Sequence, residues 1–176
     1  MTCIVALVRD GTIWMGADSA ASNSGSLDLT GEGTNKIFAK KIGDETCLIG
    51  GSGSGRFIQL LEHALDFPAL PDVNTPESVM KWLVVDVLKA ARLALKEGGN
   101  MTTKEGIDST EGRLLIGVRG RLYEILSDLY VRAQVDLFGA IGSGSDEARG
   151  AFFGIRKLKP ECDPETTILT ALEAAE

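Results

Sequence analysis

The sequence predicts an α+β protein whose antiparallel sheets are covered by layers of helices. Its elements come in a segregated order, with paired strands, two helices, paired strands and then two more helices. A doubly wound parallel sheet needs strands that alternate with helices, so this order favours antiparallel sheets. The expected strands also lack a polar face, which indicates that each sheet is covered on both sides.

Two hairpins are expected in the first 49 residues. Apolar and β-branched side chains occupy both faces of residues 2–8, as in a strand that is buried on both sides. The turn signal Asp10-Gly11 then returns the chain into a strand over 12–17. The other elements expected here are strands over 36–40 and 46–49 that turn near Gly43-Asp44, and a Ser-, Gly-, Thr- and Asn-rich loop over 22–33.

The middle of the chain predicts two helices that Gly and Pro residues delimit. A Gly/Ser run over 50–55 leads into a helix that continues to about Leu65 at helical apolar spacing. Thr75-Pro76 is a helix start, with Thr as the N-cap and Pro in the first turn. This amphipathic helix is expected to reach about Glu97, and the polar residues 100–111 are expected to form a loop.

The last third of the chain predicts a further hairpin, two short strands and two helices. These are strands over 114–118 and 122–126 around Gly120, strands over 130–135 and 138–141, a helix opened by Gly142-Ser143-Gly144-Ser145, and a final helix capped by Asp163-Pro164-Glu165. No repeat or linker divides the 176 residues, so a single domain is expected.

The composition argues against several classes of function. The net charge of -7 argues against nucleic-acid binding, because an acidic surface repels phosphate backbones. The apolar runs are too short to span a bilayer and no secretory signal is visible, so we expect a cytoplasmic protein without a membrane partner. Three cysteines without a CxxC pair predict free thiols. His63 is the only histidine, which excludes multi-histidine metal sites, and we expect it to be structural.

The start Met1-Thr2 is the sharpest chemical clue. Thr is small enough for methionine aminopeptidase to remove the preceding Met, which would leave a free α-amine on Thr2. An N-terminal amine has an ordinary pKa of about 7.7 to 8.0, and here it would be tethered to a hydroxyl that needs a base. Because many proteins begin with Met-Thr, this start alone does not establish catalysis.

Two charged residues could assist such a nucleophile. Asp18 ends the second expected strand, and the first hairpin returns it to the end of the sheet where Thr2 lies. Lys36 stands before an apolar strand, and a lysine near the nucleophile would lower the pKa of its hydroxyl and stabilise negative charge. Asp18 would keep that lysine oriented. The alternative is that both residues are solvated charges at strand ends.

Two Gly/Ser loops, over 50–55 and 142–144, stand at junctions from strand to helix. Such loops let backbone N–H groups point at an anion, so they could bind phosphate or form an oxyanion hole. Neither is followed by Gly-Lys-Ser/Thr, and neither therefore matches the P-loop pattern.

Five motifs occur in a fixed order along nearly the whole chain. They are Thr2-Cys3-Ile4-Val5, Gly16-Ala17-Asp18-Ser19, Asn35-Lys36-Ile37, Ile49-Gly50-Gly51-Ser52-Gly53 and Ala140-Ile141-Gly142-Ser143-Gly144. In this order and at these intervals they resemble the proteasome β-subunit family, including the HslV-type peptidases. The chain is still more similar to small stand-alone proteasome-like proteins of bacteria and phages, which begin Met-Thr-Cys-Ile-Val.

The resemblance implies the N-terminal-nucleophile (Ntn) hydrolase fold, a four-layer αββα sandwich of two antiparallel sheets flanked by helix pairs. It implies Thr2 as the nucleophile and, through its amine, as the base. Asp18 and Lys36 would be the charge pair beside it. The N–H of Gly51 would stabilise the oxyanion, and Ser143 would belong to the hydrogen-bond network of the amine.

The resemblance also implies a substrate and an assembly. The substrate would be a peptide or an unfolded protein, paired in extended form with the backbone of Ser22 and Gly53, and Ile49 would floor an apolar pocket. No metal or organic cofactor is implied. A homo-oligomeric ring would enclose the sites, and an ATP-dependent unfoldase is left open as a further partner.

The chain departs from the family pattern in two places. Asp18-Ser19-Ala20-Ala21-Ser22 stands where the family usually has Asp-Ser-Arg-Ala-Thr, and the sequence stops at Glu176, where family members continue into another strand. We therefore expect a domain without that last strand. Two alternatives stay open, namely an inactive ring subunit with a retained Met1 and a small-amide hydrolase that uses Cys3.

Overall fold

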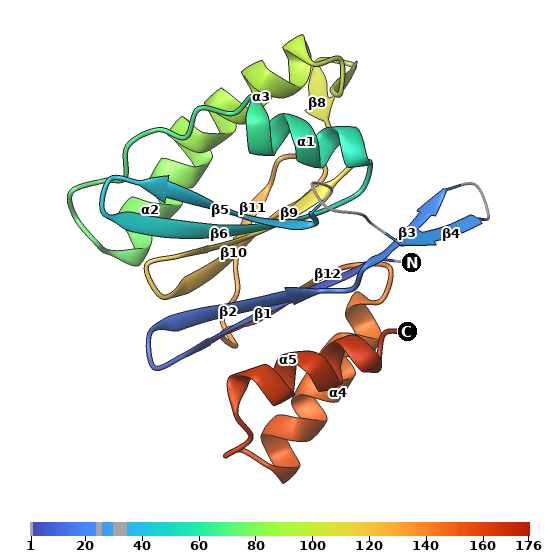
Figure 1. Ribbon diagram of the computed structural model, residues 1–176. Coiled ribbons are helices and arrows are strands. Elements are labelled where there is room, and N and C mark those ends of the chain that lie inside the picture. Colours follow the sequence, from blue (N-terminus) through green and yellow to red (C-terminus); the bar gives the residue numbers. More distant parts are fainter. Residues whose placement is uncertain (1, 24–25, 30–34) are drawn as a thin grey trace.

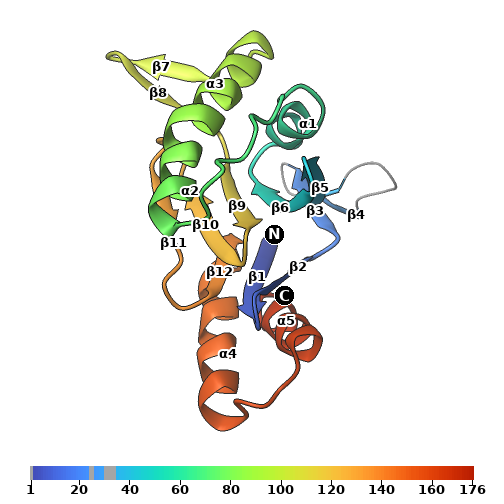
Figure 2. The same ribbon diagram turned by 90° about the vertical axis from the view of Figure 1, so that its left-hand side faces the viewer.

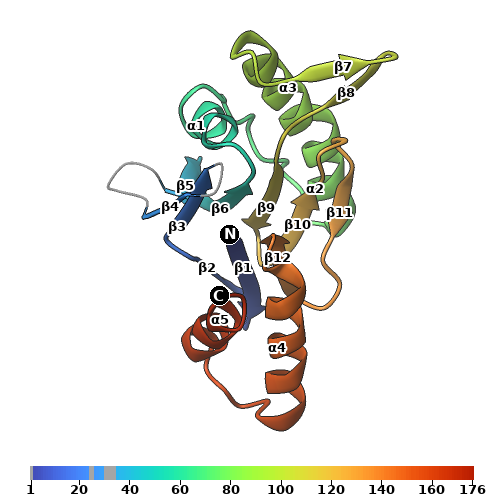
Figure 3. The same cartoon turned by 90° about the vertical axis from the view of Figure 1, so that its right-hand side faces the viewer.

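The computed structural model describes residues 2–23, 26–29 and 35–176, and these form four layers (Figure 1). A helix layer covers a five-stranded sheet, this sheet packs on a three-stranded sheet, and two helices cover the other face of the smaller sheet. Two further views keep α1 to α3 on one side and α4 with α5 on the other (Figure 2, Figure 3). The expected αββα sandwich is therefore confirmed.

The three-stranded sheet has the order β12-β1-β2, and both of its ladders are antiparallel. Its strands are β1 (Cys3–Arg9), β2 (Thr12–Ala17) and β12 (Phe138–Gly142). The expected turn joins β1 to β2, because Asp10 and Gly11 adopt positive φ angles of 52° and 75°. Such a turn has the twist that a tight hairpin requires.

The five-stranded sheet has the order β11-β10-β9-β6-β5. Its strands are β5 (Ile37–Ile42), β6 (Glu45–Ser52), β9 (Arg113–Val118), β10 (Arg121–Ile125) and β11 (Val131–Ala133). Every ladder in this sheet is antiparallel, as the segregated order of elements predicts. The turns expected near Gly43 and Gly120 are present, and both glycines have positive φ angles.

The helices begin at the residues that the capping signals indicate. They are α1 (Gly55–His63), α2 (Pro76–Trp82), α3 (Leu88–Glu97), α4 (Ser145–Leu158) and α5 (Pro164–Glu173). Thr75 caps α2 and Asp163 caps α5, each accepting a hydrogen bond from the backbone N–H three residues on. A π-helical segment, η1 (Leu83–Val87), joins α2 to α3, and the amphipathic pattern did not predict it.

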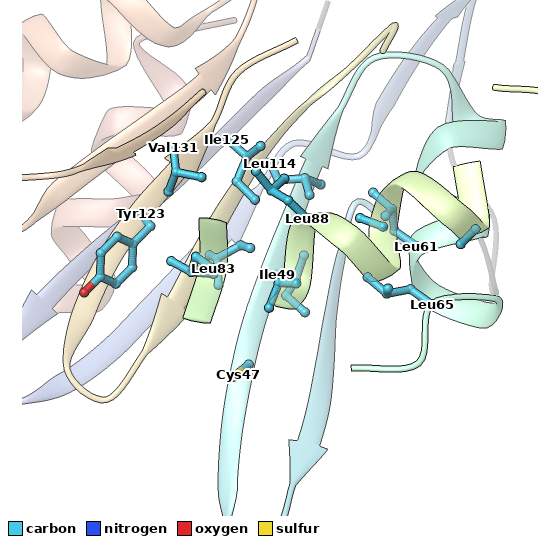
Figure 4. Packing of buried hydrophobic residues seen from close by; sticks show 14 of the residues in the cluster. Cys47, Ile49, Leu61, Leu65, Leu83, Leu88, Leu114, Tyr123, Ile125 and Val131 are labelled. Atoms are coloured by element: carbon cyan, nitrogen blue, oxygen red, sulfur yellow. The ribbon is translucent and has the colours of Figure 1, made fainter. Parts of the chain in front are cut away.

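Three apolar cores separate the four layers. The largest lies between the five-stranded sheet and α1 to α3 and includes Leu61, Leu83 and Tyr123 (Figure 4). Strand β1 serves the other two, because its odd residues face the core under α4 and α5 and its even residues face the core between the sheets. The prediction that β1 is buried on both faces is confirmed.

Three expected loops are partly strand in the structure. Within 22–33, the hairpin of β3 (Ala20–Asn23) and β4 (Ser26–Leu29) replaces the expected loop, and residues 24–25 and 30–33 lie outside the described residues. Within 100–111, β7 (Thr102–Lys104) and β8 (Ile107–Ser109) pair around a turn at Glu105-Gly106. β7 and β8 are short and mainly polar, and β4 shows only the brief alternation of Leu27 and Leu29 within a Ser-, Gly- and Asn-rich segment, so neither hairpin was predicted from the sequence.

The third expected loop is the Gly/Ser run at 50–55. Its first three residues, 50–52, belong to β6 and pair with β9. A side chain at Gly50 would come within 2.6 Å of Ile4 in the other sheet, and one at Gly51 within 2.9 Å of Ile58 in α1. These glycines therefore let the sheet approach both neighbouring layers closely.

The three cysteines are free thiols in the structure, as expected. They are Cys3, Cys47 and Cys162. None of the helices within the described residues combines the length and the hydrophobicity that a bilayer crossing requires.

Replacing Leu115 with Ala should destabilise the fold strongly. Leu115 is fully buried between the sheets, and a side chain at Gly139 of β12 would come within 2.6 Å of it. A cavity there should lower the free energy of unfolding by about 2–5 kcal/mol in urea titrations. The control Leu93→Ala removes a side chain that is 60% exposed and should change stability by about 0.5 kcal/mol or less. Equal effects of the two changes would contradict close packing between the sheets.

Candidate active site

Thr2 stands just before β1, and the loop that follows β12 holds its backbone. Its N–H donates to the Ser143 hydroxyl at 3.0 Å, and its carbonyl accepts from the Gly144 N–H at 3.3 Å. The Ser143 hydroxyl is also 3.4 Å from the Thr2 carbonyl oxygen. Antiparallel pairing of Cys3 with Gly142 brings these sequence-distant residues together. The structure thus places the expected nucleophile beside the expected Ser143.

Gly142 makes this contact sterically feasible. Its φ angle is +102°, and a Cβ atom there would stand 2.1 Å from the Thr2 carbonyl oxygen. Any side chain at this position would displace Thr2, and glycine is therefore required here.

Asp18 and Lys36 form a buried ion pair next to Thr2. One oxygen of Asp18, Oδ1, accepts from the Cys3 N–H at 2.7 Å and from Lys36 Nζ at 2.9 Å. The side chains of Lys36 and Asp18 are only 8% and 10% exposed. Because the Cys3 N–H belongs to the peptide bond that follows Thr2, both charges lie at the start of β1. The alternative of solvated strand-end charges is thereby excluded.

Cys3 is poorly suited to be a nucleophile. Its side chain is buried under α4 and donates to the Gly144 carbonyl at 3.6 Å. Burial, and then the negative charges of Asp18 and Glu147, raise the pKa of the Cys3 thiol to about 11, although Lys36 acts in the opposite direction. The reactive form of cysteine is the thiolate, and this thiol stays protonated near neutral pH.

The two glycines expected to serve the substrate differ in their backbone bonding. The Gly51 N–H donates to the Lys36 carbonyl at 2.9 Å, as part of the pairing of β6 with β5. For the Gly53 N–H, no acceptor exists among the described residues. Gly53 has a φ angle of +123°, and a Cβ atom there would stand 2.4 Å from the Glu111 carbonyl. In this conformation Gly53, rather than Gly51, offers a free amide.

A cleft of about 610 Å³ opens beside Thr2. Hydroxyl residues and glycines dominate its lining among the described residues, which consists of Thr2, Ser52, Gly53, Thr110, Glu111, Gly112, Arg113, Ser127, Gly142 and Ser143. Thr2, Gly53 and Ser143 were expected in such a site. The wall formed by 110–113 was not, because it follows a polar segment that carries no motif.

Three other residues singled out in the sequence are not among the described residues that line this cleft. Ile49 has no exposed surface and packs in the core under the helices, so it floors no open pocket in this structure. Ser22 lies in β3 opposite Leu27, and its side chain is outside the described residues. His63 ends α1 with a side chain that is 68% exposed, 3.6 Å from Glu62.

A search of the described residues for groups of three His, Cys, Asp or Glu side chains that could hold a metal ion finds none. Among the described residues, Asp18 and Lys36 form an ion pair at the start of β1, and Glu111 and Arg113 are the charged residues that line the cleft with Thr2.

Comparisons with known proteins identify the fold. No protein-family model matches the sequence, and a search of curated proteins gives no match. Among solved structures, BPH from Thiobacillus denitrificans has a TM-score of 0.76 at 22% identity, over 98% of this chain and 88% of that chain. Eukaryotic HslV from Trypanosoma brucei has a TM-score of 0.62 at 20% identity, over 98% and 89%.

A third similar structure is that of Anbu from Pseudomonas aeruginosa, with a TM-score of 0.63 at 15% identity, over 99% of this chain and 73% of that chain. At these identities the similarity establishes the fold, which is the proteasome-type Ntn hydrolase fold. The fold implied by the sequence motifs is therefore confirmed.

Replacing Gly142 with Ala should destabilise the start of β1. The new side chain would collide with the Thr2 carbonyl and sit at an unfavourable φ angle, so the free energy of unfolding should fall by about 1–3 kcal/mol. Gly150→Ala is the matched control, because Gly150 lies within α4 and a Cβ atom there meets nothing within 4 Å. Thermal denaturation of both variants tests this, and an unchanged midpoint for Gly142→Ala would contradict the contact.

The buried thiols should resist alkylation. Burial raises the pKa of Cys3 to about 11 and that of Cys47 to about 12, whereas Cys162 is partly exposed. Iodoacetamide near neutral pH should therefore modify Cys162 alone, as read by peptide mass mapping. Because the unfolded thiols ionise first, stability should fall as pH rises from about 9 towards 11. Modification of Cys3 as fast as Cys162 in the folded protein would refute the burial.

Proposed function

We propose that this chain is a threonine-type peptidase in which Thr2, after removal of Met1, attacks a peptide bond. One observation carries the proposal. Thr2 lies on a cleft, its backbone is bonded to Ser143, and the next peptide N–H binds the carboxylate that holds Lys36. These are the groups that an N-terminal nucleophile needs, and the proteasome-type fold of similar structures supports the assignment.

The reaction would begin with a proton transfer within Thr2. Removal of Met1 converts the Thr2 nitrogen into a primary amine, which takes the proton of the hydroxyl while Oγ1 attacks the substrate carbonyl carbon. The Ser143 hydroxyl, 3.0 Å from that nitrogen, would orient the amine. The Lys36 ammonium would favour the developing negative charge, and Asp18 would fix its position.

The tetrahedral intermediate then needs N–H donors. Because the Gly51 N–H already donates to the Lys36 carbonyl, we assign the oxyanion to the Gly53 N–H in this conformation. Gly51 could take this role only if its bond to Lys36 opened. The amine next gives its proton to the leaving amino group, and water hydrolyses the ester on Thr2 to restore the free enzyme.

The substrate would be a peptide or an unfolded protein. An extended segment would bind along the cleft, with backbone pairing at Gly53 and Ser22. The similar Anbu from Pseudomonas aeruginosa forms a helical assembly, which supports a homo-oligomer for this chain. A homo-oligomeric ring would restrict access to chains that have been unfolded, and an ATP-dependent unfoldase would then be a natural partner.

One observation favours a second candidate function, an inactive subunit with the same fold. The amide expected to stabilise the oxyanion, that of Gly51, is occupied. A subunit that retains Met1 would also have no free amine to act as the base.

Intact-mass measurement should distinguish the two. BPH from Thiobacillus denitrificans has been determined in complex with epoxomicin, and the same compound is a suitable probe. The proposal predicts a chain that has lost Met1 and gains one epoxomicin mass, whereas Thr2→Ala should gain none. A retained Met1 with no adduct would identify the inactive subunit.

Removal of the lysine charge should abolish peptide turnover. Lys36→Ala should lower kcat/KM by about 100-fold or more, because the negative charge on the reacting oxygen loses its cation. Lys41→Ala, an exposed lysine in the same strand, is the control and should leave turnover unchanged.

A folding defect must be separated from a catalytic one in this test. Breaking a buried ion pair costs about 3–5 kcal/mol, because the Asp18 carboxylate is left uncompensated. The double variant D18N/K36M removes both charges and should fold better than Lys36→Ala while remaining inactive. Circular dichroism with a fluorogenic peptide assay separates these readouts, and normal turnover in the double variant would remove the pair from the mechanism.

A further inference from the structure

Glu124 on β10 is a buried carboxylate, 2% exposed, at which arginines from three elements meet. Arg132 of β11 donates to it directly, and Gln134 donates to the same oxygen at 3.0 Å. Arg113 of β9 and Arg149 of α4 approach it at 3.7 Å and 3.9 Å. Strands β9, β10 and β11 are neighbours in the larger sheet, and α4 belongs to the helix layer on the far side of the smaller sheet (Figure 3).

The charge of this cluster does not balance. One carboxylate faces three guanidinium groups, each of which is always protonated. Arg132 and Gln134 donate hydrogen bonds to one oxygen of Glu124, Oε2, whereas Arg113 faces the other oxygen, Oε1, at 3.7 Å without a hydrogen bond. The cluster therefore keeps an excess of two positive charges, and the 3.7 Å ion pair of the half-exposed Arg113 compensates its charge only in part, although the chain as a whole carries a net charge of -7.

Arg113 is also the residue of this cluster that reaches the cleft. It lines the same space as Thr2, and its side chain is 51% exposed. Arg113 on β9 is the partner of Ser52 on β6 in the antiparallel ladder. The residue after Ser52 is Gly53, which carries the free amide. An extended substrate that reaches Thr2 would pass within a few residues of this guanidinium.

Other charges in the neighbourhood do not cancel this effect. Glu111 lines the same wall but is solvent-exposed and makes no ion pair with Arg113. Asp18 is neutralised by Lys36 on the other side of Thr2. The rest of the described lining consists of hydroxyl side chains and glycines, and none of these residues forms an apolar pocket for a large side chain.

We propose that Arg113 makes the cleft selective for peptides that present a carboxylate close to the scissile bond. A guanidinium matches a carboxylate with two parallel hydrogen bonds, so the preference should be geometric as well as electrostatic. The carboxylate can come from an Asp or Glu side chain or from the C-terminus of the peptide. This inference rests on the proposed peptidase function and names its substrate class.

Matched fluorogenic peptides test the proposal. In the first set, each peptide has an amidated C-terminus and carries Glu, Gln or Lys at one of several positions beside the reporter. A second set compares free with amidated C-termini. We expect one Glu position, or the free C-terminus, to raise kcat/KM by about fivefold to tenfold over Gln. The set in which the gain occurs identifies the source of the carboxylate.

Arg113→Gln should abolish this preference, and Arg132→Gln is its matched control. Both changes remove one charge from the same cluster, but only Arg113, and not Arg132, is among the described residues that line the cleft. The preference should survive Arg132→Gln. Equal rates for Glu and Gln peptides in the unchanged protein, or the same loss in both variants, would overturn the proposal.

Failure of the peptidase function gives a different result. In that case no peptide is cleaved and no epoxomicin adduct forms, so turnover cannot be compared. The inference is then decided by fluorescence anisotropy with labelled Glu and Gln peptides on the Thr2→Ala protein. The site is supported if the Glu peptide binds more tightly than the Gln peptide and if Arg113→Gln removes this difference. Equal affinities for the Glu and Gln peptides would refute it.

Discussion

The ion pair between Asp18 and Lys36 is the constraint on which the rest of the site depends. Asp18 follows β2 of the smaller sheet and Lys36 precedes β5 of the larger one, so the 2.9 Å contact ties the two sheets together where the cleft opens. Burying two charges costs several kcal/mol per ion, which their attraction offsets only in good geometry. The pair therefore tolerates little displacement. Because the same carboxylate binds the Cys3 N–H, it also fixes where the chain start can lie.

The apolar layers hold this polar end in place through their close packing. Gly50 approaches Ile4 across the sheet interface, and Gly51 approaches Ile58 of α1, at distances that leave no room for a side chain. The end of β6 is thus clamped between the other sheet and a helix. Lys36 directly precedes β5, the strand that pairs with β6, and its carbonyl accepts from the Gly51 N–H. The apolar packing around Gly50 and Gly51 therefore determines the position of Lys36. Closely packed interiors transmit small shifts, so the geometry of the Asp18–Lys36 pair is coupled to the packing of the core.

Local signals in the sequence predicted most of the fold. Turns such as Asp10-Gly11 and caps such as Thr75 depend only on adjacent residues, and the structure has them where they were expected. The hairpins at 20–29 and 102–109 were missed, because their strands are only three or four residues long and lie within polar segments that are typical of loops. In the site, Thr2 lies with Ser143 and the ion pair as the motifs indicate. Ile49 does not, and the cluster at Glu124 was missed altogether, since it joins β9, β10, β11 and α4 through pairings that no local pattern contains.

The backbone of Lys36 has a second consequence for chemistry at Thr2. In the proposed mechanism its side chain supplies the cation, while its carbonyl accepts from the Gly51 N–H, so that amide is not free to bind a substrate. Gly53 follows β6 and has a φ angle of +123°, so its amide does not continue the regular alternation of the strand. β6 ends at Ser52, so the amide of Gly53 lies just beyond the ladder, where no described acceptor meets it. Strand pairing therefore uses the amide of one glycine in the fold and leaves the amide of the other free for the role proposed for it.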